Sequence, residues 1–176
     1  MPSEERNPKF DPAKFLVERG WLPEIALSDF DLGCRIVEKM RGNNKGLIIS
    51  GDYGVGKTAF VKAVFDGFQL FSLPGDEWAL SDTHDYIDST LYGNVIFDDV
   101  GSEHTQNSYG VKVEVFADFI VHRHLINPKG RLIITTNLTT RDFERRYGGR
   151  VVSRLKDLCF AARFAGKDKR EWEVIT

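Results

Sequence analysis

The segment from Gly51 to Thr58 reads GDYGVGKT and is the part of the sequence best suited to chemistry. It fits the pattern G-x-x-x-x-G-K-[ST], in which glycines let backbone N–H groups point inward around a phosphate. A helix that begins at this loop adds the positive end of its dipole. Lys57 can then reach the β- and γ-phosphates of a nucleoside triphosphate, and the Thr58 hydroxyl can bind Mg²⁺.

The context favours this interpretation over a glycine-rich hairpin turn. The motif follows the apolar run GLIIS at 46–50 and precedes a helical pattern over 58–67. Strand, loop and helix in this order are what the binding mechanism requires. We therefore predict an ATP site formed by Gly51, Asp52, Tyr53, Gly54, Val55, Gly56, Lys57, Thr58 and Ala59.

Two acids follow a second apolar strand, which reads VIFDD at 95–99. Strand-end acids often only begin a turn, but about forty residues after a phosphate-binding loop they fit a Walker B element. Asp98 would hold Mg²⁺, directly or through water, and Asp99 would orient or deprotonate the attacking water. Asp99 is one methylene shorter than a glutamate, so weak catalysis is compatible with this motif.

Asn137 ends another apolar strand, LIITTN at 132–137. A strand followed by such residues is more often a plain turn. Beside the Walker B strand, however, an amide can hydrogen-bond the attacking water or the γ-phosphate. We predict that Asn137 senses the phosphate.

A basic cluster follows, and two interpretations of it are open. On the predicted helix 150–158, Arg150 and Arg154 share one face while apolar residues occupy the other. Charge spacing alone favours a solvated face, paired with Asp142 and Glu144. The alternative is an arginine finger that completes the ATP site of a neighbouring subunit. The arginines are Arg145, Arg146, Arg150 and Arg154.

The elements that position these residues alternate along the chain. Apolar strand patterns lie at 46–50, 69–73, 94–97, 131–136 and 159–164. Helical patterns lie at 13–19, 28–41, 58–67, 82–92, 111–127, 141–146 and 150–158, with Ser28 or Asp29 as a candidate N-cap. Such alternation predicts an α/β fold: a three-layer P-loop sandwich with a mostly parallel five-stranded sheet between helices.

The order of motifs resembles the AAA+ ATPases of the DnaC/IstB group, which are bacterial helicase loaders, their phage and mobile-element relatives, and ATPase partners of transposases. The resemblance covers roughly residues 28–170 through GDYGVGKT, VIFDDVG, LIITTNL, RYGGRVVSRL and GKDKR. It implies the sheet order 5-1-4-3-2 and a homo-oligomer. Arg154 matches the arginine finger, with Arg150 as second choice, and Arg170 resembles a second sensor that contacts the γ-phosphate.

Three departures from that group bear on function. Only 67–93 separates the phosphate-loop helix from the Walker B strand, where family members carry a longer insert that contributes to single-stranded DNA binding. The segment 1–27 is a lead-in too short for a partner-binding domain, before a core at 28–176. After the core we expect no room for a full helical lid.

Bulk composition sets further bounds. The 176 residues, 41% hydrophobic and 28% charged, suit one soluble domain, and a net charge of −2 leaves DNA binding to a local basic patch. Cys34 and Cys159 form no CxxC pair, which argues against a disulfide or zinc site and fits the cytoplasm. The chain has no apolar stretch of about 18 residues, so we expect no membrane span.

Three functions compete. The first is an oligomerising AAA+ ATPase that acts on a helicase or transposase in DNA replication or transposition, with ATP and Mg²⁺ as cofactors. The second is a nucleotide-dependent switch or assembly scaffold with little turnover. The third is a small-molecule kinase, which would need an acceptor pocket and a mobile lid that the sequence does not indicate.

Overall fold

A computed structural model of the chain describes residues 10–23, 29–72, 91–103, 106–108, 111–113 and 115–166. Its centre is a five-stranded sheet in the order β2-β3-β6-β1-β7. The strands are β1 (Gly46–Ser50), β2 (Gln69–Ser72), β3 (Val95–Val100), β6 (Leu132–Thr136) and β7 (Cys159–Arg163). All neighbours in it are parallel. Numbered within this sheet the order is 2-3-4-1-5, which confirms the predicted order read in reverse.

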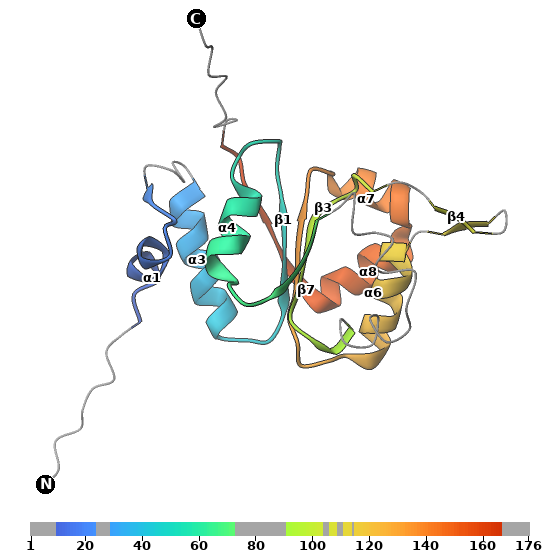
Figure 1. The fold of residues 1–176 in the computed structure, drawn as a ribbon, viewed down its shortest axis with the longest axis horizontal. Helices are drawn as coiled ribbons and strands as arrows, with labels where there is room; N and C mark the ends of the chain where they lie inside the picture. Colours follow the sequence, from blue (N-terminus) through green and yellow to red (C-terminus); the bar gives the residue numbers. More distant parts are fainter. Residues whose placement is uncertain are drawn as a thin grey trace, which may run out of the picture.

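Helices cover both faces of the sheet and make three layers (Figure 1). One side carries α1 (Pro12–Glu18), α3 (Phe30–Arg41) and α4 (Lys57–Val64). The other carries α6 (Val115–Ile126), α7 (Thr140–Tyr147) and α8 (Gly149–Leu158). Among the described helices none is long and apolar enough to cross a bilayer.

The central strands β1, β3 and β6 are largely apolar because both of their faces are mostly buried. Successive side chains on a strand point to opposite faces. Ile96 and Ile133 accordingly join the core beneath α3 and α4, whereas Phe97 and Ile134 join the core beneath α6, α7 and α8. This packing fixes the strand register, because a shift by one residue would exchange the two cores.

The prediction of one helix over 111–127 is wrong at its start. Strand β5 (Val111–Val113) pairs antiparallel with β4 (Gln106–Ser108), and α6 begins only at Val115. Valines at every second position form a strand pattern with a period of two. The polar helix predicted at 82–92 lies outside the described residues, except for helical Leu91 and Tyr92.

Asp29 has a different partner from the one its position suggests. It precedes α3 but makes no side-chain capping bond to that helix. Its carboxylate instead accepts hydrogen bonds from the backbone N–H groups of Ala165 and Gly166, each at 3.2 Å. The start of α3 is thereby joined to the chain that leaves β7. Ser28, the other candidate cap, lies outside the described residues.

The segment predicted as a lead-in contributes to the core. Leu16 of α1 is fully buried, and Trp21 is 1% exposed with its ring edge-on to Phe60 at 5.2 Å between centroids. Trp21→Ala is therefore expected to lower the free energy of unfolding by about 3–5 kcal/mol. Urea unfolding followed by circular dichroism measures it. Val17→Ala, at a side chain 44% exposed on α1, should change little, and equal effects of the two variants would contradict the packing role.

Candidate functional site

The phosphate-binding pattern forms a loop from the end of β1 to the start of α4, with backbone that side chains would obstruct. Gly56 precedes α4 with φ of 97°, in the left-handed region. A Cβ atom added at Gly51 would lie 2.5 Å from the carbonyl oxygen of Phe164. Both glycines therefore serve the close turn of the loop, and α4 begins directly after it, where the first N–H groups of a helix have no acceptor within that helix.

Lys57 lies inside this loop rather than on the surface. Lys57 is only 5% exposed. Its Nζ donates hydrogen bonds to the carbonyl oxygens of Gly51 at 2.9 Å and Asp52 at 2.7 Å, and to Oδ1 of Asn137 at 2.6 Å. The lysine of the loop and the asparagine after β6, eighty residues apart, thus share one site.

Asp98 faces the same loop from the end of β3. It is 5% exposed, and its Oδ1 accepts hydrogen bonds from the hydroxyls of Thr58 at 2.9 Å and Thr135 at 2.5 Å. Hydroxyl and carboxylate oxygens suit Mg²⁺. Thr135 was not among the residues predicted from the sequence. Its signal was a polar residue at the end of an otherwise apolar buried strand.

Asp99 has a backbone conformation that sets it apart from Asp98. Its φ is 59°, and the register between β3 and β6 shifts between Phe97 and Val100. Such an irregularity redirects the side chains of a strand. The Asp99 N–H donates to the Thr135 hydroxyl at 2.9 Å, so one threonine contacts both acids.

The other predicted binding residues differ in exposure. Tyr53 is 65% exposed and Val55 is 1% exposed. Asp52 and Ala59 are exposed, and Gly54 is half-buried. Arg170, the candidate second sensor, lies outside the described residues.

The four arginines do not form one cluster. Arg145 pairs with Asp142 at 3.0 Å on the surface, as one interpretation expected. Arg146 points inward to the loop after β3, where Nη1 donates to the Gly101 carbonyl at 2.6 Å. Arg150 is exposed. Arg154 is half-buried, and its Nε and Nη1 atoms have no hydrogen-bond acceptor within the part of the chain that the structure describes.

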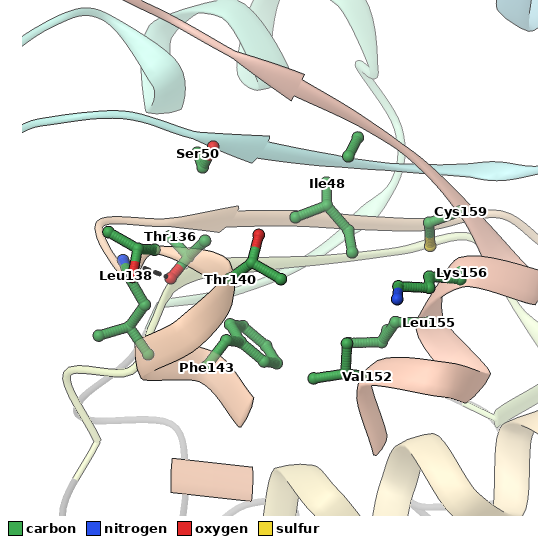
Figure 2. Close-up of a pocket in the computed structure, with 12 residues that line it drawn as sticks. Ile48, Ser50, Thr136, Leu138, Thr140, Phe143, Val152, Leu155, Lys156 and Cys159 are labelled. Atoms are coloured by element: carbon green, nitrogen blue, oxygen red, sulfur yellow. Dashed lines mark hydrogen bonds between the residues drawn. The ribbon is translucent and has the colours of Figure 1, made fainter. Parts of the chain in front are cut away.

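A separate hollow of about 150 Å³ lies between the sheet and α7 and α8. Figure 2 shows Ile48 and Cys159 of the sheet around it, with Phe143 of α7 and Val152 of α8. Burial raises the pKa of the Cys159 thiol to about 12. The thiol is therefore protonated at neutral pH, which excludes a thiolate nucleophile there.

The residues at the strand ends are suited to bind Mg²⁺ and a nucleoside triphosphate. The loop has a glycine, Gly51, at a position with no room for a side chain, and it contains a buried ammonium group. The Thr58 and Asp98 oxygens, 2.9 Å apart, supply a hard-cation donor set beside it. Two elements about forty residues apart in the sequence, α4 with its preceding loop and β3, provide these groups.

Comparison with known proteins finds similarity in structure but not in sequence. No protein-family model matches the chain, and no curated protein is similar to it in sequence. Among solved structures, the crystal structure of the DnaC helicase loader is similar, with a TM-score of 0.59 and 21% identity over 80% of this chain and 91% of that one. A Signal Transduction ATPase with Numerous Domains that carries a tetratricopeptide repeat sensor, from Pyrococcus horikoshii, gives a TM-score of 0.45 and 15% identity over 74% of this chain and 22% of that one. The chain has the fold of that loader structure, with a parallel five-stranded sheet between two layers of helices.

Proposed function

We propose that this chain binds ATP with Mg²⁺ and hydrolyses it to ADP and phosphate. The observation that carries the proposal is the meeting of Lys57 with Asn137 and of Thr58 with Asp98 at one edge of the sheet. Phosphoryl transfer to water needs a cation on the phosphates, a metal ligand and a group that orients the water. The site contains a candidate for each.

Each residue has a separate task in this proposal. Lys57 holds the β- and γ-phosphates, and Thr58 and Asp98 hold Mg²⁺, which when bound neutralises charge on the phosphates. Asp99 orients the attacking water and accepts its proton. Asn137 hydrogen-bonds the γ-phosphate or that water. An ammonium group has three N–H donors, and here they point to three oxygens. We expect Lys57 to exchange its contact with Asn137 for a contact with the phosphate when ATP binds.

The two acids should give separable defects. Asp98→Asn is expected to weaken Mg²⁺-dependent ATP binding, because it removes a charged metal ligand. Asp99→Asn should leave ATP bound but lower turnover by about 10²-fold, the typical contribution of a positioned general base. Calorimetry with and without Mg²⁺, together with single-turnover hydrolysis, distinguishes the defects. Equal effects at both positions would contradict the division of roles.

The fold similarity to a helicase loader supports a proposal about the wider role. We propose a homo-oligomeric ATPase that acts in DNA replication or transposition on a helicase or transposase partner, with single-stranded DNA bound through a local basic patch. Phosphate release measured with and without single-stranded DNA tests this role. Stimulation by DNA supports it, and a pull-down from the native host identifies the protein partner.

A nucleotide-dependent switch is the second candidate, and the Lys57–Asn137 hydrogen bond favours it. ATP binding would exchange this 2.6 Å contact for a phosphate contact and so release the end of β6, which leads into α7. A switch binds ATP and changes partner affinity without turnover. Tight binding with no phosphate release, alone or with DNA, would select the switch over the ATPase.

A further inference from the structure

The turn that follows Asp99 has its backbone polar groups bound on several sides. The Asp99 carbonyl accepts hydrogen bonds from the N–H of Ser102 at 3.1 Å and from its hydroxyl at 2.5 Å. The Val100 carbonyl accepts from the Thr136 hydroxyl at 2.6 Å. Gly101 has φ of 105° and approaches Leu138 so closely that an added Cβ would lie 2.6 Å from it. The turn is therefore held in one unusual conformation.

Glu103 and Arg146 hold the centre of this turn from both sides. Oε2 of Glu103 accepts a hydrogen bond from the Gly101 N–H at 2.7 Å, and Nη1 of Arg146 donates to the Gly101 carbonyl at 2.6 Å. Arg146 also donates from Nη2 to the Glu103 carbonyl at 2.5 Å and pairs with its carboxylate at 3.5 Å. One arginine thus contacts three oxygens of the segment from Gly101 to Glu103.

Tyr147 completes the arrangement from the last residue of α7. Its hydroxyl donates to Oε1 of Glu103, which is only 8% exposed. A buried carboxylate is costly unless it is paired and hydrogen-bonded, and here both oxygens are used. We call Glu103, Arg146 and Tyr147 the clamp. It joins the turn after Asp99 to α7, although α7 lies about forty residues further along the chain.

We propose that the clamp positions Asp99 for its reaction with water, so that Glu103, Arg146 and Tyr147 are positioning residues of the site. The inference rests on the proposed ATPase function. Asp99 has a left-handed φ of 59°, a conformation that persists only where surrounding contacts impose it. The clamp supplies those contacts two residues beyond Asp99, and Thr135 supplies one at its N–H.

Loss of a clamp residue is expected to lower turnover. Arg146→Ala should lower kcat by roughly 10- to 100-fold, because a misplacement of about 1 Å at a catalytic group has effects of this size. ATP affinity should stay within about twofold, because the clamp holds the turn beyond Asp99 rather than the groups assigned to the phosphates and Mg²⁺. Arg145→Ala is the matched control: it removes the same charge one residue away, from a surface pair with Asp142.

A double variant separates positioning from general damage. If Arg146 acts only through Asp99, substituting Arg146 in a protein that already lacks the Asp99 carboxylate should cause no further loss of turnover. Asp99→Asn with Arg146→Ala should therefore turn over within about twofold of Asp99→Asn alone. A further tenfold loss would mean that Arg146 acts elsewhere, and the proposal would be overturned.

Glu103→Gln covers the case in which Arg146→Ala does not fold. A glutamine keeps an oxygen for the Gly101 N–H and a group beside Tyr147, but it loses the ion pair with Arg146. Its kcat should fall by less than that of Arg146→Ala, with unchanged ATP affinity. Wild-type kcat in Glu103→Gln would argue against the clamp.

Amide hydrogen exchange tests the clamp without using activity. Arg146→Ala and Glu103→Gln should each speed exchange at Gly101 and Ser102, whereas Arg145→Ala should not. If wild-type protein releases no phosphate, the ATPase proposal fails, while faster exchange still supports the clamp as the support of this turn. Unchanged exchange in both clamp variants would overturn the clamp even in an active ATPase.

Discussion

Lys57→Ala is expected to abolish tight ATP binding. The side chain supplies a buried ammonium group whose Nζ lies 2.7–2.9 Å from two carbonyl oxygens of the phosphate-binding loop. Charge-assisted hydrogen bonds to phosphate are among the strongest in proteins, and a low-dielectric surrounding strengthens them. Alanine leaves the triphosphate charge without this cation. Isothermal titration calorimetry in the presence of Mg²⁺ measures the loss.

Two controls make the Lys57 result interpretable. Lys57 is only 5% exposed, so circular dichroism and thermal unfolding must show that the variant is folded. Lys62→Ala removes the same charge from an exposed position on α4 and should bind ATP normally. Binding by Lys57→Ala within about threefold of wild type, a change below about 1 kcal/mol, would contradict the phosphate-loop assignment.

The central sheet was predictable because its signals are local. Each strand is an apolar run, each run is followed by a helix or a turn, and the motif order resembles a group with a known strand order. Val95–Val100 and Leu132–Thr136 accordingly lie where their sequences place them. Burial on both faces explains why these runs are continuous rather than alternating.

The hairpin of β4 and β5 shows where local signals failed. Val111 to Asn127 contains many apolar residues, and a helix accounts for most of them. Only the alternation at Val111 and Val113 distinguishes the strand from the helix that follows, and three residues give a weak periodicity.

The clamp was beyond sequence reasoning for a different reason. Arg146 and Glu103 are 43 residues apart, and nothing near Arg146 distinguishes it from Arg145. Adjacent residues on a helix point in different directions. Arg145 therefore contacts Asp142 on the surface, whereas Arg146 contacts Gly101. Such a difference depends on how α7 packs against the sheet, so only the tertiary structure reveals it.

Arg154 is the candidate for a group that acts on a neighbouring subunit. It lies on α8, and its Nε and Nη1 atoms are buried without an acceptor in the described part of the chain. Leaving buried donors unsatisfied costs about 1–3 kcal/mol, more for charged groups. If the side chain turns outward, an anion brought by a neighbour, such as the γ-phosphate, would satisfy the guanidinium. We therefore propose that Arg154 is the arginine finger, with exposed Arg150 as the alternative.

Arg154→Ala is expected to fold, bind ATP and be nearly inactive. A finger stabilises charge that develops only in the transition state, so its loss lowers turnover far more than affinity. Fingers contribute about 10³-fold or more, which corresponds to roughly 4 kcal/mol. Phosphate release and calorimetry measure the two effects. Arg150→Ala, one turn earlier on α8, should stay active, and the reverse pattern would make Arg150 the finger.

Mixing two inactive variants tests whether the finger acts between subunits. Lys57→Ala subunits keep the finger, and Arg154→Ala subunits keep an intact nucleotide site. In a head-to-tail oligomer mixed at equal concentrations, about a quarter of the interfaces combine the two intact parts, so activity should recover toward that fraction. Near-normal activity of both Arg154→Ala and Arg150→Ala at every protein concentration would instead mean that neither arginine acts on a neighbouring subunit. That result would remove the oligomeric active site and leave an ATPase that completes its site within one subunit.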